Sequence, residues 1–127
     1  MPRFTPSLVT LLMLGLAGCA TLGARSRSSD SAEVGTASFY ARKFHGRTTA
    51  SGVRYDPAKM MAAHRTLPFG TRVRVTNLEN HRSVVVTVVD RGPYRRGRVI
   101  DLSRGAAREL GFVRDGLATV RLEVLEP

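Results

Sequence analysis

Alternation of polar and apolar residues in the second half of the chain predicts several short β-strands. Residues 71–78 read Thr-Arg-Val-Arg-Val-Thr-Asn-Leu, and their polar and apolar side chains alternate as on a strand with one solvated face. Residues 83–89 are almost continuously apolar, which is typical of a strand buried on both faces. Residues 35–40, 98–102 and 118–124 are also β-prone. The chain is therefore expected to be mainly β.

Helix signals are few and short. Ser103 precedes residues 104–110 and Gly111 follows them, which predicts a helix with a serine cap and a left-handed glycine stop. Asp56 followed by Pro57 predicts a second, shorter helix, since aspartate caps a first turn and proline fits its first position. Many short strands with little helix favour a closed barrel, because closure removes the exposed edges of a small sheet.

The start of the chain has the pattern of a bacterial lipoprotein signal. Residues 8–16 are apolar but too few to cross a bilayer as a stable helix, and a positive charge precedes them. Residues 16–19, Leu-Ala-Gly-Cys, then place the one cysteine of the chain after small residues, as in a lipobox. We therefore expect residues 1–18 to be a signal peptide and Cys19 to be lipidated.

The segment after the cysteine is polar and lacks regular apolar spacing. Residues 19–34 are expected to be the lipidated Cys19 and a flexible tether, and residues 35–127 the folded domain. Ala20, in place of an aspartate, favours the outer membrane by the sorting rules of bacterial lipoproteins. The expected location is thus a lipid anchor in a membrane that faces the periplasm.

The chain is strongly basic, with 20 Lys and Arg against 10 Asp and Glu and a formal net charge of +10. A cytosolic protein with this charge would suggest nucleic acid as a partner. An exported protein does not meet chromosomal DNA, so lipid headgroups and cell-wall polymer are the expected anionic partners, unless the charge serves solubility alone. Scattered histidines and one cysteine give no metal-ligand spacing, so neither a metal nor a cofactor is expected.

Two residues are candidates for acid–base chemistry. Asp90 ends an apolar run, so its carboxyl emerges at the mouth of the barrel, where lost hydration favours the protonated, proton-donating form. The alternative is that Asp90 accepts backbone N–H bonds in the turn that begins at Arg91. His64 precedes a Leu-Pro-Phe-Gly turn, where it can bond a carboxyl or a sugar or serve a structural role.

Aromatic side chains are candidates for sugar binding. Tyr40, Tyr55 and Tyr94 can each stack on a sugar ring or fill the core or rim, and we assign Tyr40 and Tyr55, together with Arg91, to substrate binding. Asp101, like Asp90, can either take part in acid–base chemistry or accept backbone hydrogen bonds. Its place just ahead of the predicted helix favours the structural role.

Four segments resemble the rare lipoprotein A (RlpA) family. They are residues 49–52 (Thr-Ala-Ser-Gly), 62–71 (Ala-Ala-His-Arg-Thr-Leu-Pro-Phe-Gly-Thr), 90–93 (Asp-Arg-Gly-Pro) and 97–103 (Gly-Arg-Val-Ile-Asp-Leu-Ser). Their order and spacing match the family over nearly the whole of residues 35–124, and the lipobox fits as well. The resemblance implies a six-stranded double-psi β-barrel, to which the pattern adds one or two short helices.

The resemblance also implies an activity and partners. Active members of the family are septal-ring lipoproteins and lytic transglycosylases on peptidoglycan glycan strands that lack stem peptides, which implies divisome proteins as further partners. The family's catalytic histidine and aspartate fall on His64 and Asp90. Its catalytic glutamate would follow Gly52, but this position is Val53, which cannot titrate.

Loss of the glutamate leaves two functions open. A lytic transglycosylase can act with one acid/base, because its nucleophile is the C6 hydroxyl of the substrate and no second carboxylate has to activate water. The leading prediction is therefore an endolytic peptidoglycan transglycosylase that uses Asp90, active in cell division and wall remodelling. The alternative is a non-catalytic peptidoglycan-binding or divisome-interaction lipoprotein.

Overall fold

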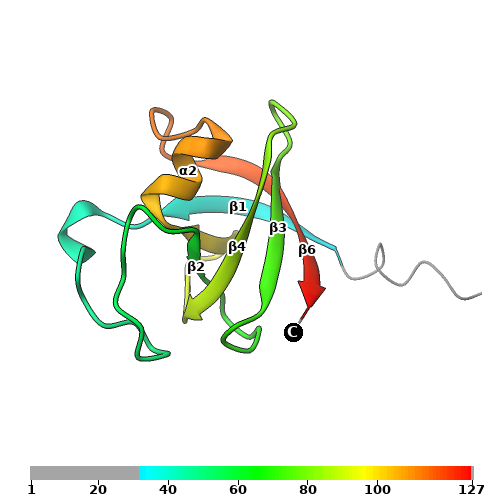
Figure 1. The fold of residues 1–127 in the computed structure, drawn as a ribbon. Helices are drawn as coiled ribbons and strands as arrows, with labels where there is room; N and C mark the ends of the chain where they lie inside the picture. Colours follow the sequence, from blue (N-terminus) through cyan, green and yellow to red (C-terminus); the bar gives the residue numbers. More distant parts are fainter. Residues whose placement is uncertain (1–31, 127) are drawn as a thin grey trace, which may run out of the picture.

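Six strands close into a barrel in the computed structural model, which describes residues 32–126 (Figure 1). The strands are β1 (Glu33–Phe39), β2 (Met61–Ala63), β3 (Arg72–Asn77), β4 (Ser83–Asp90), β5 (Arg98–Leu102) and β6 (Ala118–Glu126). A 3-10 helix, η2 (Arg42–Phe44), follows β1, and the helix α2 (Arg104–Leu110) packs against β1, β4 and β5. Among residues 32–126, no helix is long and apolar enough to span a membrane.

The strand order around the barrel differs from the order along the chain. It runs β1-β5-β2-β4-β3-β6 and returns to β1. The pairs β1–β5 and β2–β4 are parallel, and the other four pairs are antiparallel. Two parallel pairs of this kind need crossovers between strands distant in sequence. This closed, mixed barrel confirms the predicted six-stranded double-psi fold.

The alternation read from the sequence becomes the inner and outer faces of the barrel. On β3, Val73 and Val75 are fully buried, whereas Arg72 and Arg74 point outward and are exposed. The expectation that residues 83–89 form a strand buried on both faces is wrong for its first half. Val86 and Val88 face the barrel core and are fully buried, and Val89, on the other side of the strand, is buried in a second cluster with Tyr55 and Met61. The earlier positions are half-buried or exposed.

The helix predicted after Ser103 is confirmed at both ends. The Ser103 hydroxyl accepts the Ala106 N–H at 3.3 Å, and Gly111 has the left-handed φ of 78°. The second predicted helix, at Asp56-Pro57, is wrong. Asp56 instead closes a turn, because its carboxylate accepts the Ala58 N–H at 2.9 Å. The next strand begins at residue 61, which leaves no room for a helix.

The folded domain begins earlier than the predicted boundary at Gly35. Strand β1 starts at Glu33, which pairs with Leu122 of β6. The polar composition of the segment before Gly35 gave no strand signal. Residues 33 and 34 nevertheless belong to the sheet, because their backbone pairs with β6. The predicted signal peptide, Cys19 and the rest of the tether up to residue 31 lie outside the described residues.

Candidate functional site

A cleft of about 810 Å³ opens beside the carboxyl end of β4. Its walls come from the end of β1, residues 44–49, the loop after β4, and β5. The charged and tyrosine side chains that line it are Tyr40, Arg47, Tyr55, Asp90, Arg91, Tyr94, Arg95, Arg98 and Asp101. Four of the five candidate site residues therefore meet in one cleft, and the fifth, His64, is not part of its lining.

Asp90 is the last residue of β4, and two donors hold its half-buried carboxylate. The Tyr40 hydroxyl donates to Oδ2 at 2.5 Å, and the Ala50 N–H donates to Oδ1 at 2.9 Å. A further bond, from the Ser51 N–H to the Val89 carbonyl at 3.1 Å, fixes the Ala50 loop against the end of the strand. The donors thus come from the residue directly after β1 and from residues 49–52, and not from the turn after Asp90. A carboxylate aimed into a cleft by two neutral donors is suited to exchange a proton with a ligand.

Tyr40 remains protonated beside this carboxylate. Burial of its ring raises the pKa of the phenol well above the ordinary value of 10.0, and the hydrogen bond to Asp90 and the negative charges of Asp90 and Asp101 raise it further. Its ring stacks on that of Tyr55, with centroids 4.5 Å apart. Because the phenol keeps its proton, it acts as a fixed hydrogen-bond donor to the carboxylate.

The raised pKa of Tyr40 predicts a titration that optical absorbance can detect. The folded-state pKa lies above the ordinary value of 10.0, so protonated Tyr40 stabilises the fold below pH 10, and this contribution falls as the pH rises further. The measurement is the absorbance spectrum of the wild type minus that of Tyr40→Phe. At about pH 11, one unit above the usual pKa of tyrosine, we expect this difference to show no tyrosinate from Tyr40. Urea-unfolded protein is the control, in which the difference should appear. A tyrosinate midpoint near 10 in the folded protein would contradict the buried hydrogen bond.

The other two tyrosines have opposite environments. Tyr55 is only 2% exposed, and its oxygen accepts the Arg104 N–H at 3.0 Å. Burial raises the pKa of Tyr55 as well, although the bond from Arg104 partly offsets this. Tyr55 therefore has no open ring face for a sugar and instead supports the ring of Tyr40. Tyr94 is 74% exposed at the edge of the cleft and presents the more accessible aromatic surface.

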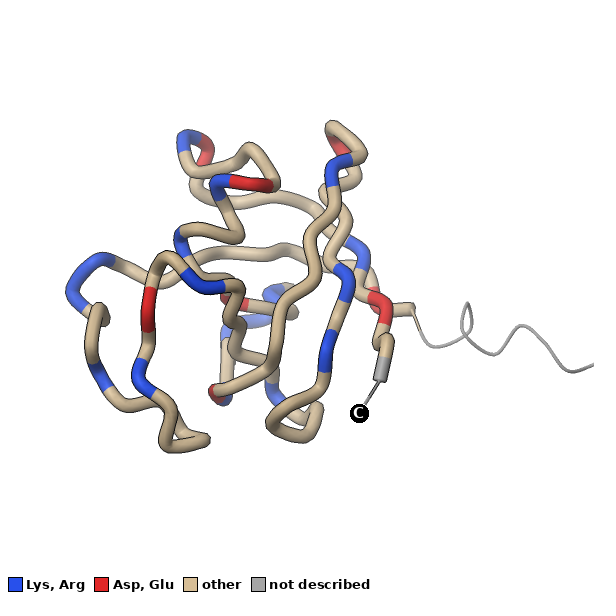
Figure 2. Tube along the Cα trace, in the orientation of Figure 1, with Lys and Arg blue, Asp and Glu red and all other residues tan. Residues whose placement is uncertain are grey.

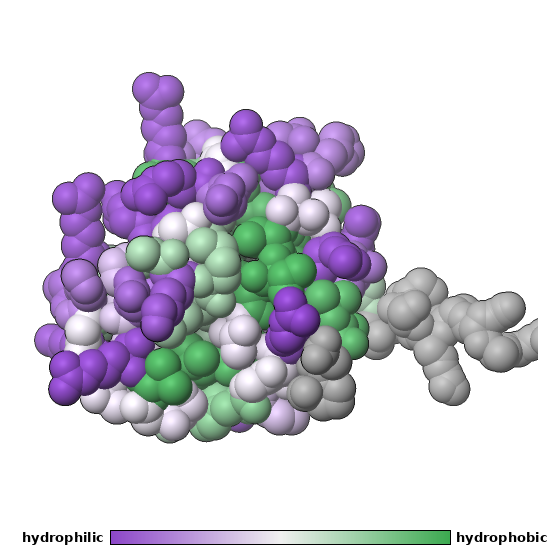
Figure 3. All heavy atoms as spheres, viewed as in Figure 1, coloured by the Kyte–Doolittle hydropathy of each residue, from purple (hydrophilic) through white to green (hydrophobic). Residues whose placement is uncertain are grey.

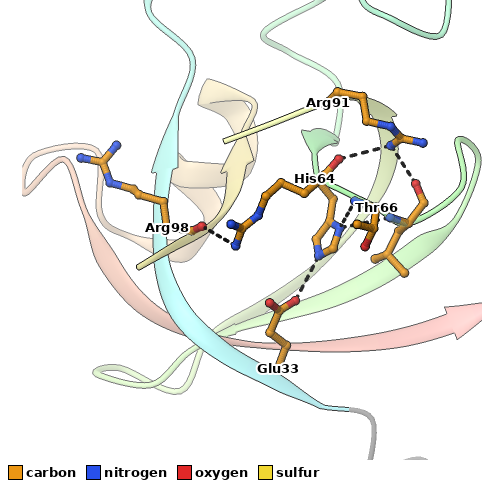
Figure 4. A network of polar contacts seen from close by, with 7 residues as sticks. Glu33, His64, Thr66, Arg91 and Arg98 are labelled. Carbon is orange, nitrogen blue, oxygen red and sulfur yellow. Dashed lines mark hydrogen bonds and ion pairs between the residues drawn. The ribbon is translucent and has the colours of Figure 1, made fainter. Parts of the chain in front are cut away.

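His64 lies in a network outside the cleft lining (Figure 4). Its Nε2 lies 3.0 Å from a carboxylate oxygen of Glu33, and its Nδ1 accepts the N–H groups of Thr66 and Leu67, each at 3.2 Å. Since Nδ1 accepts, the proton of the neutral ring is on Nε2. The backbone N–H of His64 bonds the Asp90 carbonyl at 3.1 Å, so the two residues are linked through the main chain. The ring ties the turn after β2 to the start of β1, and sequence reasoning missed Glu33 as its partner.

Arg91 forms no ion pair with the neighbouring Asp90 carboxylate. Its Nη1 donates to the carbonyls of His64 and Leu67, at 3.2 and 2.8 Å. The guanidinium lies 4.0 Å from the centre of the Phe69 ring. Arg91 therefore holds the loop after β2 in place. Both bonds use Nη1 of the guanidinium that we assigned to substrate binding.

Asp101 is a second carboxylate in the same cleft. It accepts a hydrogen bond from Ser38, its partner in the parallel register of β1 and β5. Ser103, and not Asp101, caps the helix, so the structural contact of Asp101 is with strand β1. Parallel pairing brings residues 38 and 101 together, and no local sequence signal shows this.

Val53 occupies the position of the family glutamate, in the loop that supplies the Ala50 donor. Its side chain is 44% exposed and does not line the cleft. Its carbonyl accepts both the backbone N–H and the hydroxyl of Thr49, at 2.8 and 2.6 Å. The main chain at Val53 therefore shapes the loop, and its side chain contributes no charge.

No metal centre is formed within residues 32–126, since no three His, Cys, Asp or Glu side chains there group as metal ligands. Arginine side chains are the more prominent charges of the cleft: Arg47, Arg91, Arg95 and Arg98 line it beside the two aspartates. Figure 2 shows the basic residues spread over most of the barrel. The cleft can thus exchange protons and bind an anionic ligand.

Residues 32–122 match the family described as lytic transglycolase. A protein from Nostoc sp., named probable endolytic peptidoglycan transglycosylase RlpA, is 66% identical over 93 residues, which are 72% of this chain and 25% of that protein. The endolytic peptidoglycan transglycosylase RlpA of Pseudomonas aeruginosa is 55% identical over 94 residues, which are 74% of this chain and 28% of that protein. The chain therefore spans about a quarter of the length of these two relatives.

Solved structures with a similar fold include a protease inhibitor and an expansin. The Streptomyces papain inhibitor superposes with a TM-score of 0.61 at 23% identity, covering 76% of this chain and 96% of its own. The expansin of Clavibacter michiganensis superposes with a TM-score of 0.59 at 25% identity, covering 75% of this chain and 50% of its own. These likenesses support the barrel architecture.

Proposed function

The chain belongs to the lytic transglycolase family of RlpA proteins, and we propose that its barrel cleaves peptidoglycan glycan strands in the Asp90 cleft. The observation that carries this proposal is the carboxylate of Asp90, held in an open cleft by Tyr40 and Ala50. The names of the relatives supply the substrate class and the type of reaction.

The reaction needs one residue that first donates a proton and then accepts one. Protonated Asp90 gives its proton to the glycosidic oxygen as the bond from that oxygen to the muramic acid C1 breaks. The resulting carboxylate then takes the proton of the C6 hydroxyl as that oxygen bonds to C1, which yields a 1,6-anhydro end. Hydrogen bonds from Tyr40 and Ala50 stabilise the carboxylate between the two steps. Asp101 adds negative charge to the cleft, which favours the positive charge that develops at C1.

The test of this proposal is digestion of peptide-free glycan strands by the purified protein. Mass spectrometry should detect chains that end in 1,6-anhydromuramic acid. Intact strands after prolonged digestion would contradict the proposal.

A second candidate function is glycan binding without cleavage. The observation that favours it is Val53, since no carboxylate stands at the family's glutamate position. The arginine-lined cleft would then serve for recognition alone.

Val53→Glu separates the two candidates. Restoring the carboxylate is expected to raise turnover by about tenfold or more, at the lower limit of general acid–base effects, because the loop next to Asp90 is otherwise complete. Val53→Gln is the matched control. Glutamine has the shape of glutamate but cannot titrate, so this variant should have the turnover of the wild type. An inert wild type beside an active Val53→Glu would show that the natural chain is a binding protein on an enzyme scaffold.

The location of the protein is a separate part of the proposal. The lipobox supports export, removal of residues 1–18 and acylation of Cys19, and Ala20 supports the outer membrane. Attachment there would hold the domain beside the wall, and a role in cell division with divisome partners follows from the family resemblance alone.

Cys19→Ser tests the anchor. The substitution removes the thiol that acylation requires, so we expect the protein to move from the membrane pellet to the soluble periplasmic fraction in cell fractionation. Substituting Ser26, outside the lipobox, by Ala is the control and should leave the protein in the pellet. Sedimentation of Cys19→Ser with outer membrane after a salt wash would contradict the lipobox assignment.

A further inference from the structure

A second pocket, of about 380 Å³, adjoins the cleft and has no place in the reaction above. Tyr40 and Tyr55 line both cavities, so the stacked tyrosine pair lies between them. The basic side chains of the second pocket are Arg42, His45, Arg104 and Arg108. We refer to this cavity as the basic pocket.

The positive charges of the basic pocket come from two elements that the fold brings together. Arg42 belongs to η2, just after β1, and His45 follows this helix. Arg104 and Arg108 are one turn apart on α2. In Figure 3, hydrophilic side chains gather on the sides of the molecule that carry η2 and α2 in Figure 1. The pocket is thus a concave surface with guanidinium groups on both walls.

No acidic side chain lines the basic pocket. Within residues 32–126, none of these arginines forms an ion pair with a carboxylate, and the Asp56 carboxylate beside the pocket accepts the Ala58 N–H. The guanidinium of Arg104 lies 5.3 Å from the centre of the Phe39 ring, and the backbone N–H of Arg104 donates to the Tyr55 oxygen. A preformed, uncompensated group of guanidinium ions favours an anionic ligand.

We propose that the basic pocket binds a free carboxylate on the glycan strand whose neighbouring residues occupy the cleft. This inference rests on the proposed function, because it takes the ligand from the strand. In strands without stem peptides, each muramic acid carries a lactyl group that ends in a free carboxylate. A strand that leaves the cleft past Tyr40 meets the basic pocket, where planar guanidinium groups match a carboxylate in shape and charge. Amidation by a stem peptide or reduction to an alcohol removes this charge.

The test compares two substrates and two double variants of the purified protein. The substrates are peptide-free strands and the same strands after their carboxylates are reduced to alcohols. Arg42→Gln/Arg108→Gln removes two exposed charges of the pocket, and Arg74→Gln/Arg114→Gln removes two exposed charges that line neither cavity. Equal thermal melting of both variants and the wild type verifies folding.

We expect the pocket variant to raise KM on the unreduced strands by roughly three- to tenfold, as loss of exposed charge pairs allows, with kcat nearly unchanged. The control variant should match the wild type. On the reduced strands, the difference between the pocket variant and the wild type should disappear, because the carboxylate is gone. Equal KM values on the unreduced strands, or a difference that persists on the reduced ones, would overturn the proposal.

Equilibrium binding of the same strands separates this proposal from the proposed function. If the wild type binds the strands but does not cleave them, the proposed cleavage reaction is wrong. The carboxylate proposal is then tested by comparing the Kd values of the same variants and strands in place of their KM values. If the pocket variant loses binding to vesicles of anionic lipid and not to glycan strands, the pocket serves a membrane surface and the proposal is overturned.

Discussion

Asp90→Asn is expected to lower the rate of 1,6-anhydro product formation by about 10²–10⁴-fold, the usual range for loss of a general acid–base group. The amide keeps the size of the side chain and an oxygen that can accept the Tyr40 hydroxyl, but it cannot transfer a proton. Product should be quantified by mass spectrometry on peptide-free strands. Binding to isolated sacculi should change little, because the arginines of the cleft remain.

Asp115→Asn is the matched control for this loss, since Asp115 is exposed in the loop between α2 and β6 and lines neither cavity. It removes the same charge and should keep the wild-type rate. An Asp90→Asn protein as active as the wild type would remove Asp90 from the mechanism.

Phe112→Ala is expected to have the largest effect on stability. Phe112 is 1% exposed, and its ring meets that of Phe39 edge-on, with centroids 5.7 Å apart. Truncation of a buried phenylalanine costs about 3–5 kcal/mol of the free energy of unfolding. This is a large share of the roughly 5–15 kcal/mol that stabilises a typical domain.

Urea denaturation monitored by circular dichroism measures this loss. Leu117→Ala is the control, because Leu117 is 43% exposed and its truncation should cost less than about 1 kcal/mol. Equal midpoints for the two variants would show that Phe112 does not carry the packing assigned to it.

Strands with a clear local pattern could be predicted from the sequence. The alternation at β3 and the serine cap of α2 are examples, since both are fixed by residues close together in the chain. Strand β2 gave no such signal. Its three residues, Met61–Ala63, are all buried and too few to alternate, and they form a strand because β4 and β5 pair with them on either side. The six-strand count came from family resemblance.

The candidate site could be predicted only in part, because most of its contacts join residues that are distant in the sequence. Asp90 was visible because it ends an apolar run. Its donors, Tyr40 and Ala50, lie 50 and 40 positions earlier, and barrel closure alone brings them to the carboxylate. The orientation of His64 depends on Glu33, 31 positions away, which the sequence placed in a tether.

Digestion of peptide-free glycan strands in heavy-oxygen water tests the central claim most directly. If Asp90 transfers the C6 hydroxyl proton and that oxygen is the nucleophile, every new muramic acid end is the 1,6-anhydro form, the other new end is a free sugar hydroxyl, and neither contains solvent oxygen. New reducing ends that carry the heavy isotope would show hydrolysis by water, and strands left intact would show that the barrel binds glycan without cleaving it. Either of these results would contradict the lytic mechanism.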